Sequence, residues 1–324
     1  MINKSEELIT ISDDVTNEAY GFQPYNRPID QLLNYGFIPL DKPSGPTSHE
    51  VVAWVRRILN VEKAGHSGTL DPPVTGLLPI GIGEATKVLG VLLMGPKEYY
   101  AVARLHSPVD RDKLNRVISE FVGEIYQRPP QRSSVKRTIR TRVIYDLEIV
   151  EQIGRLLLLR VVCQAGTYVR KLIYDIGEVL GPGATMIELR RTKVSHIDEK
   201  DGLVRLHELL DAYQTWKEKG DEEYLRKLIK PVEYVVLNLK KVFIRDSAVD
   251  AICHGAQLAI PGIVKLSKNI SKGDLVAIHT LKGELVALSE AVMSTDEILN
   301  ADKGIAFLTR RVIMRAGTYP RMWK

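Results

Sequence analysis

The chain has 324 residues, 44% of them hydrophobic, which is enough for about two domains with sizeable cores. Lys and Arg total 45 against 40 Asp and Glu, giving a formal net charge of +5 and a pI near 9.0, a balance that suits an acidic partner without requiring one. With no signal-peptide pattern and no apolar run long enough to span a bilayer, the sequence predicts a cytoplasmic protein that does not act in a membrane.

The two cysteines, Cys163 and Cys253, are far apart in the sequence, and neither lies in a spacing typical of a metal site. Nothing favours a disulfide between them, although sequence alone does not exclude one. We therefore expect neither a metal ion nor a cofactor in this protein.

Residues 1–35 form an acidic segment with little hydrophobic periodicity. Two basic residues, Lys4 and Arg27, stand against six acidic ones: Glu6, Glu7, Asp13, Asp14, Glu18 and Asp30. The apolar run at residues 29–33 is long enough for one or two turns of helix. Extensions of this kind are often disordered, so the residues alone predict little order before residue 29.

From residue 36 the pattern alternates between strands and helices. We predict a helix over residues 48–59 with Ser48 as its N-cap. Its apolar stripe consists of Val51, Val52, Val55, Ile58 and Leu59. Further helices are expected over residues 110–121 and 169–180, the second ending at a Gly-Pro-Gly stop signal. Strands are expected over residues 37–40, 77–83, 98–106, 142–151, 156–163 and, as a closing strand, 190–197.

These elements predict one α+β domain over residues 36–236, built on a mixed sheet with a helix-flanked cleft. Residues 203–230, which are charged and mostly helical in pattern, form its last part or a connector. Because its apolar segments are long and regular enough for a core of their own, we expect this domain to fold without the rest of the chain.

The loop of residues 65–72 holds a single carboxylate, Asp71, between two ordinary elements. Gly65 and Gly68 permit a tight turn or the close approach of a ligand, and Pro72 biases Asp71 toward an extended conformation. A lone loop Asp is most often only solvated, yet functional residues favour rigidly held loops. On the residues alone, both interpretations stay open.

Residues 127–145 contain no acidic residue. We expect a loop before the strand at residues 142–151, broken by Pro129 and Pro130. Its basic residues are Arg128, Arg132, Lys136, Arg137, Arg140 and Arg142. Such a loop is solvated by default, but the lack of any compensating acid favours contacts with phosphate groups.

From residue 237 the sequence changes to short strands separated by turns. Examples are residues 242–244, 275–278 and 285–288, the last two separated by a turn at Lys282 and Gly283. This spacing predicts a small β-barrel or pseudobarrel over residues 237–324.

Several motifs together resemble one enzyme family. Residues 40–49 read LDKPSGPTSH, residues 65–72 read GHSGTLDP and residues 75–79 read TGLLP. This run is similar to the TruB class of pseudouridine synthases, and within it to the archaeal and eukaryotic dyskerin branch, which works with H/ACA guide RNAs. Residues 246–256 and the closing residues 319–323 resemble a PUA domain, an RNA-binding module. The resemblance covers about residues 30–324, and without a long basic tail the archaeal type is the better match.

The resemblance implies three catalytic residues. Asp71 matches the catalytic aspartate, and Arg170 matches the arginine that pairs with it. Tyr99 matches the aromatic residue that stacks on the target uracil and assists proton removal from it. Without the resemblance, a helix-surface arginine and a strand-edge tyrosine are the ordinary interpretations.

Four further residues are implied in substrate binding. Tyr168 matches a second active-site aromatic residue, Leu189 an apolar residue that closes the pocket, and Lys97 shares the segment of Tyr99. His66 matches a loop histidine that helps to fill the space left when the target nucleotide flips out. A satisfied turn histidine and a buried leucine are the alternatives.

The chemistry of the reaction suits a single carboxylate. Pseudouridine formation detaches uracil from its ribose and rejoins it through carbon, and the reacting sugar carbon is anomeric, as in a glycosidase. A hydrolase of that kind needs a second carboxylate, whereas an isomerase that recaptures its own base does not. Whether Asp71 attacks the sugar or the base, or acts only as a base, stays open.

The resemblance implies the catalytic subunit of an H/ACA guide-RNA particle that isomerises uridine in ribosomal RNA, and also in transfer RNA. The implied partners are guide RNA, substrate RNA and small accessory proteins of the Nop-ten, Gar-one and kink-turn-binding ribosomal-protein types. A PUA domain over residues 237–324 would bind RNA, and residues 1–35 would pack against it.

Three other functions remain as alternatives. The first is a stand-alone enzyme for the T-loop of transfer RNA. The second is a non-catalytic RNA-binding scaffold, which would have no use for Asp71, Tyr99 and Arg170 together. The third is a carboxylate-dependent hydrolase, which would release free uracil.

Overall fold

The computed structural model describes residues 7–128 and 138–322. Two sheets organise these residues. One sheet has the order β11 (Lys230–Pro231), β2 (Gly36–Lys42), β4 (Thr75–Ile82), β9 (Ala184–Val194), β5 (Lys97–Leu105), β8 (Leu156–Cys163), β7 (Arg140–Ile153) and β6 (Gly123–Gln127). Two short strands join it, β3 (Ala64–His66) on β4 and β10 (Ile197–Asp198) on β9. Because β4 and β9 are parallel and the other pairs antiparallel, the prediction of a mixed sheet is confirmed.

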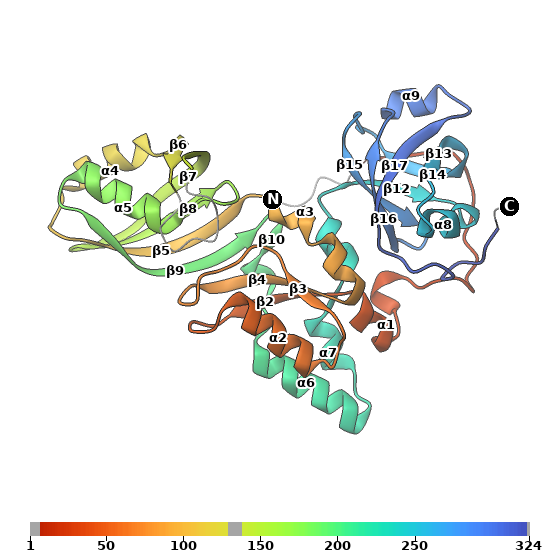
Figure 1. Ribbon diagram of the computed structural model, residues 1–324, viewed down its shortest axis with the longest axis horizontal. Coiled ribbons are helices and arrows are strands. Elements are labelled where there is room, and N and C mark those ends of the chain that lie inside the picture. The colour runs from red at the N-terminus through yellow and green to blue at the C-terminus, as the bar shows by residue number, and fades with distance from the viewer. Residues whose placement is uncertain (1–6, 129–137, 323–324) are drawn as a thin grey trace.

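Helices flank both halves of this sheet. They are α1 (Ile29–Asn34), α2 (Ser48–Ile58), α3 (Gly90–Leu93), α4 (Arg111–Glu120), α5 (Val169–Leu180), α6 (Leu206–Lys219) and α7 (Glu223–Leu228), with 3-10 helices at Pro24–Asn26, Gly83–Val88, Glu199–Asp201 and Val232–Val236. Figure 1 shows α4 and α5 on the half formed by β5–β9, whereas α2, α6 and α7 cover the half formed by β2–β4. Among the described residues, no helix combines the length and the apolar character needed to cross a membrane.

The first turn of α2 differs from the sequence prediction by one residue. The N-cap is Thr47, whose hydroxyl accepts a hydrogen bond from the Glu50 N–H while the Glu50 carboxylate accepts one from the Thr47 N–H. Ser48 is instead buried and hydrogen-bonded to Leu70. Both residue types cap helices well, so the sequence could not separate them.

The last long strand of this sheet is more central than the sequence predicts. The strand predicted over residues 190–197 is confirmed for residues 190–194, but its start and its closing position are wrong, because β9 begins at Ala184 and lies between β4 and β5, where it joins the two halves. The side chains of Thr185, Ile187 and Glu188 are all exposed, so no hydrophobic alternation marks this stretch. The chain leaves β9 through Ser195, whose φ is 56°. β6 was also missing from the prediction.

The second sheet has the order β1 (Leu8–Thr10), β14 (Ile263–Ser267), β12 (Lys240–Ile244), β15 (Leu275–Thr280), β16 (Leu285–Ala291), β17 (Ile305–Val312) and β13 (Leu258–Ala259). It carries α8 (Asp246–Cys253), α9 (Thr295–Leu299) and a 3-10 helix at Ile260–Gly262. Figure 1 shows this unit at the opposite end of the molecule from α4 and α5. Its short, mostly antiparallel strands agree with the small β-pseudobarrel predicted from the sequence.

The acidic N-terminal segment packs on this second unit from Leu8 to Phe22, whereas the buried residues of α1 belong to a core of the first unit. β1 pairs with β14, and three ion pairs follow the same path: Glu7 with Lys268 at 2.7 Å, Asp14 with Arg245 at 3.0 Å and Glu18 with Lys282 at 3.4 Å. The excess of acid in the segment therefore matches basic side chains on the surface that it crosses.

One apolar cluster belongs to both units. Its members are buried on either side of the junction: Phe37, Leu77, Leu89, Val194 and Val236 on one side, with Ala277, Leu285, Leu288 and Ile313 on the other. A buried ion pair lies at the same junction, where Arg27 contacts Glu233 at 2.7 Å and Glu233 also accepts a hydrogen bond from the Leu285 N–H. The two units therefore share part of their core.

Candidate active site

Asp71 lies in the loop between β3 and β4, and buried polar groups hold that loop on both sides of it. The Ser48 hydroxyl accepts a hydrogen bond from the Leu70 N–H at 2.9 Å and donates one to the Leu70 carbonyl at 3.1 Å. The fully buried ammonium of Lys42 donates to the carbonyls of Pro43, Pro72 and Val74 at 2.9, 2.9 and 3.0 Å. The carboxylate of Asp71 is therefore presented from a fixed backbone, with 57% of its side chain exposed.

Arg170, in the first turn of α5, forms an ion pair with Asp71. The two residues are 99 positions apart in the sequence. The start of α5 is fixed by Gln127 on β6, which accepts a hydrogen bond from the Tyr168 N–H at 3.0 Å and donates one to the Tyr168 carbonyl at 3.1 Å. These two hydrogen bonds place Arg170 at the loop of Asp71, where its planar guanidinium can orient the carboxylate.

Tyr99 lies on β5 directly opposite Arg191 on β9, and its ring packs against the core under α5. The charge of the Arg191 guanidinium acts on the Tyr99 hydroxyl, which places the two groups near each other. Burial raises the pKa of Tyr99 above its usual value, and the charge of Arg191 offsets this only in part. The Tyr99 hydroxyl is therefore protonated at neutral pH.

Arg191 connects the strands and the loop that form the site. Only 1% of it is exposed, and its guanidinium donates to the carbonyls of Leu77 on β4 and Gly68 in the Asp71 loop, both at 2.9 Å. Gly76 has a φ of +100°, and a Cβ there would lie 2.2 Å from the Arg191 carbonyl oxygen. Glycine is therefore required where β4 meets β9 beside this residue.

His66 and Leu189 lie at the edges of this arrangement. The His66 ring contacts His49 edge-to-face, with the ring centroids 5.0 Å apart, and its Nδ1 is buried without a hydrogen-bond partner. Burial, His49 and Arg191 lower the pKa of His66, so its imidazole is neutral at pH 7. Leu189 is half-buried on β9 beside Ala101 and packs against the same core as Tyr99.

The Lys97 side chain forms its hydrogen bonds with the protein backbone. Its ammonium is buried and donates to the carbonyls of Leu92, Leu93 and Gly95. Burial and the nearby charge of Arg191 lower the pKa of Lys97 to about 8. An ammonium has three N–H groups, and all three have acceptors here, so this geometry favours a role in holding the turn before β5. The predicted contact with substrate stays a prediction.

The basic stretch is only partly a loop. Arg140 and Arg142 lie on β7, which begins two residues before the strand predicted from residue 142, so the predicted loop is wrong only at its end. Arg142 lies over Gly166 in the turn before α5, and Arg128 is exposed after β6. Arg132, Lys136 and Arg137 lie outside the described residues. Contacts of these six residues with RNA phosphates stay a prediction.

Sequence reasoning missed two residues of the site, Lys42 and Arg191. Burial lowers the pKa of Lys42, and the negative charge of Asp71 acts in the opposite direction, which places the two close together. Neither residue has a local signal, because a charged residue in a strand is normally taken as solvent-facing. Among the described residues, no group of three or more His, Cys, Asp and Glu side chains is arranged to hold a metal ion.

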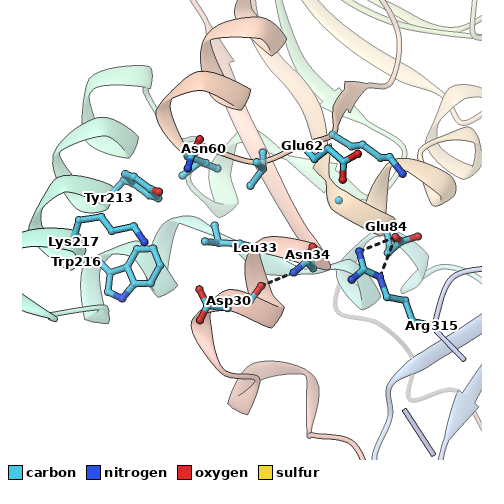
Figure 2. A pocket seen from close by; sticks show the side chains of 14 residues that line it. Asp30, Leu33, Asn34, Asn60, Glu62, Glu84, Tyr213, Trp216, Lys217 and Arg315 are labelled. Atoms are coloured by element: carbon cyan, nitrogen blue, oxygen red, sulfur yellow. Dashed lines mark hydrogen bonds and ion pairs between the residues drawn. The ribbon is translucent and has the colours of Figure 1, made fainter. Parts of the chain in front are cut away.

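Two cavities lie elsewhere. One, of about 240 Å³, is bounded by α1, α6 and the residues after α2, and Figure 2 shows Asp30, Trp216 and Arg315 around it. The other, of about 310 Å³, lies between the N-terminal segment and residues 314–318. Neither is lined by Asp71 or Arg170. With these two side chains about half exposed, the candidate site is an open surface that a macromolecule can reach.

Models of four known domains match the chain. The TruB family pseudouridylate synthase N-terminal domain matches residues 56–169, and the tRNA pseudouridylate synthase B C-terminal domain matches residues 170–237. A PUA domain matches residues 240–313, and a DKCLD domain matches residues 1–52.

Full-length relatives carry one common name. The chain is 55% identical over 323 residues to the probable tRNA pseudouridine synthase B of Methanocaldococcus jannaschii, covering 100% of this chain and 96% of that protein. It is 53% identical over 321 residues to the protein of the same name from Pyrococcus furiosus, covering 99% and 94%.

Solved structures are similar over the same length. A chain in the structure of an H/ACA RNP bound to a substrate RNA containing 2'-deoxyuridine has a TM-score of 0.91 and 51% identity, covering 98% of this chain and 97% of that one. A chain in a Cbf5-Nop10-Gar1 complex has a TM-score of 0.90 and 52% identity, covering 98% and 97%.

Proposed function

Because the chain belongs to the TruB family of pseudouridine synthases, we propose that it isomerises uridine in ribosomal RNA as the catalytic subunit of an H/ACA guide-RNA particle. The observation that carries the proposal is the similarity over nearly the whole chain to a protein of an H/ACA RNP bound to substrate RNA. A fold can host many functions, so the arrangement around Asp71 must support the same conclusion.

That arrangement supports an isomerase. The reaction breaks the bond from the sugar C1' to N1 of uracil and forms one from C1' to C5. C5 loses a proton and N1 gains one, so no further reactant is needed. Asp71 supplies one oriented carboxylate for this chemistry, as nucleophile or as base, and Arg170 holds it. Tyr99, Tyr168, Leu189 and His66 would surround the extruded base.

The division of the chain supports an RNA-guided particle. We propose a catalytic domain over residues 36–236 and a PUA domain over residues 237–324 that binds guide RNA, with residues 1–35 packed on it through β1. The proposed partners are guide RNA, substrate RNA, and accessory proteins of the Nop10 and Gar1 types named with the similar structures. A kink-turn-binding protein of the ribosomal type completes the proposed particle.

Reconstitution tests this function. The full chain is combined with accessory proteins and a guide RNA from the same cells, and tritium release from C5-labelled uridine is measured in a matched ribosomal RNA fragment. We expect release that requires the guide and stops when the guide is mismatched. Release that ignores the guide would contradict the proposal.

A second candidate is modification of transfer RNA without a guide. The names of the relatives from Methanocaldococcus jannaschii and Pyrococcus furiosus favour it. The same assay on an unmodified transfer RNA, with the chain alone and with the particle, separates the two substrates. Free uracil among the products would indicate a hydrolase instead.

A further inference from the structure

The catalytic sheet consists of two halves that meet at β4 and β9 (Figure 1). The half with β2 and β4 forms a core with α2 and α6, and the half with β5, β7 and β8 forms a separate core with α4 and α5. β4 and β9 are paired over two residues, Thr75 with Arg190 and Gly76 with Arg191, whereas β5 is paired with β9 along its whole length. Val194, at the end of β9, adds an apolar contact with the first half. The halves are therefore joined at a short junction, which we call the seam.

The groups of the candidate site are divided between these halves. Asp71 precedes β4 on the first half, whereas Tyr99 on β5, Leu189 on β9 and Arg170 on α5 belong to the second. The ion pair of Asp71 with Arg170 crosses from one half to the other. A misplacement of about 1 Å can slow a reaction by about a hundredfold, so the site depends on how firmly the seam is fixed.

Arg190 crosses the seam on one face of the sheet. Its Nη1 and Nη2 donate to the two carboxylate oxygens of Asp41 at 2.9 and 3.3 Å. Asp41 lies on β2, so the arginine side chain spans β4 to reach it. The Arg190 Nε donates to Glu199 at 2.9 Å, but Glu199 follows β10, which is paired with β9 itself. A two-pronged pair with a carboxylate fixes direction as well as distance, so the bond to Asp41 can hold the two halves in one arrangement.

The next residue along each of these two strands holds the Asp71 loop. Arg191 donates to the Gly68 carbonyl at 2.9 Å, and Lys42 donates to the Pro72 carbonyl at 2.9 Å. Gly68 and Pro72 lie on either side of Asp71 in the sequence. Because successive strand residues point to opposite faces, these bonds lie on the other face of the sheet from the ion pair. The seam and the loop are therefore held from both faces.

We propose that Arg190 is a positioning residue whose ion pair with Asp41 fixes the two halves of the sheet, so that Asp71 on one half meets the target uridine held by the other. Without this pair the seam moves, and the reacting groups meet less often in the productive arrangement. The chemical step then slows while the surfaces that bind RNA stay intact. The inference rests on the proposed function, since it concerns the isomerisation of uridine.

Asp41→Asn tests the proposal, because asparagine keeps the shape of Asp41 and loses its charge. Single-turnover rate and RNA affinity are measured separately in the reconstituted full-length particle. The rate should fall about tenfold, the effect of losing one hydrogen bond to a charged group, with affinity within about twofold. Glu199→Gln is the matched control: it removes the other carboxylate of the same guanidinium without touching the seam, so its rate should stay within about twofold of wild type.

A double-mutant cycle assigns the effect to the pair. Arg190→Gln should lower the rate about tenfold in the wild type and by less than about twofold more in Asp41→Asn. Equal losses in Asp41→Asn and Glu199→Gln would indicate a merely structural need for a carboxylate beside Arg190 and overturn the proposal. So would a wild-type rate in Asp41→Asn, or a loss of affinity as large as the loss of rate. If Asp41→Asn does not fold, as judged by circular dichroism, Arg190→Lys is used under the same criteria, since lysine keeps the charge and loses the two-pronged bond.

Amide hydrogen exchange in the free full-length protein gives a second measurement that needs no activity. Asp41→Asn should speed exchange about tenfold at the seam, residues 75–77 and 190–192, and change it less than about twofold in α2 and α5. A uniform increase would show general destabilisation, and no increase would show that the pair does not hold the seam; either overturns the proposal. An inactive wild-type particle contradicts the proposed function, and exchange then decides on the seam. An active particle with a full rate in Asp41→Asn contradicts only the role of Arg190.

Discussion

At the scale of residues, Asp71 is held more tightly than its exposure suggests. Ser48 binds the residue before it, Lys42 binds the carbonyl of the residue after it, and Arg170 binds its carboxylate. A catalytic group held by its surroundings needs no reorganisation when the substrate arrives. The side chain can therefore stay open to a large substrate and still keep one orientation.

Asp71→Asn tests whether the carboxylate is the reacting group. Asparagine keeps the shape but cannot act as nucleophile or base, so we expect tritium release to fall by about a thousandfold or more while RNA affinity changes by less than about threefold. Asp175→Asn is the matched control, because Asp175 pairs with Lys171 on the same helix, α5. Turnover near wild type in Asp71→Asn would show that the reacting carboxylate is elsewhere.

The sequence could predict only part of this site. Asp71 and Arg170 were assigned by resemblance, since no local pattern reveals a pair 99 positions apart. Lys42 and Arg191 were not predicted, because their charged groups are buried within the sheet and hydrogen-bonded to backbone carbonyls. Such groups are visible only after the strands are paired, when the carbonyls that accept from them come together.

At the scale of elements, the most regular segments matched their predictions. α5 and β8 have the predicted bounds: α5 has a clear apolar stripe and a Gly-Pro-Gly stop signal, and β8 is an almost uninterrupted apolar run after the turn at Gly154. The first half of β9 was not predicted, because pairing with its neighbouring strands, and not its own sequence pattern, makes it a strand. The order of the N-terminal segment could not be predicted for the same reason, since it depends on partners more than 200 residues away in the sequence.

The Arg27–Glu233 pair ties the N-terminal segment to the first sheet. Two hydrogen bonds of 2.7 and 2.8 Å join these buried side chains. Arg27→Met should lower the free energy of unfolding by about 3–5 kcal/mol, because Glu233 is left buried and unpaired. Urea denaturation measures this loss. Arg226→Met, which removes a more exposed pair with Glu222, should cost less than about 1 kcal/mol.

The double variant Arg27→Met with Glu233→Gln checks the mechanism. Removing the orphaned charge should recover part of the stability that Arg27→Met loses. A double variant that is less stable by the sum of both single losses would show that packing, and not the unpaired charge, explains the effect.

Glu284 on the loop before β16 gives a pH-dependent contact with the same segment. It accepts hydrogen bonds from the Phe22 N–H and the Tyr319 hydroxyl, and burial raises its pKa above the usual 4.5 in spite of these and the charge of Arg27. The folded state therefore favours the protonated form. This stabilisation is complete below the unfolded pKa and is lost as pH rises through the folded one.

Glu284→Gln should remove that dependence. Urea denaturation at several pH values between about 4 and 7 gives the free energy of unfolding of each protein. We expect the stability of wild type relative to Glu284→Gln to fall as pH rises. Comparing the two proteins cancels the carboxylates with lowered pKa, such as Asp274 and Glu84, which act in the opposite direction. A constant difference would contradict the assignment to Glu284.

At the scale of the whole molecule, the sequence predicted two units, but it did not predict that the two units share part of a core. Alternation along a strand shows that a face is buried, but it does not show what covers it. Phe37 and Leu77 on the first sheet are covered in part by Leu285 and Ile313 of the second unit. The expectation that residues 36–236 fold alone came from their apolar content and took no account of this shared surface.

We therefore expect residues 33–238 alone to be much less stable than the full chain. Removing the second unit exposes the shared cluster, removes the bond from Leu285 to Glu233, and breaks the pair of Arg315 with Glu84. Ile313→Ala in the full chain makes the smallest version of this change and should cost about 2–5 kcal/mol. In calorimetry the full chain should unfold in one transition, and Ile313→Ala should shift it as a whole. Two separate transitions, with the earlier one alone moved by Ile313→Ala, would show that the first unit stands by itself.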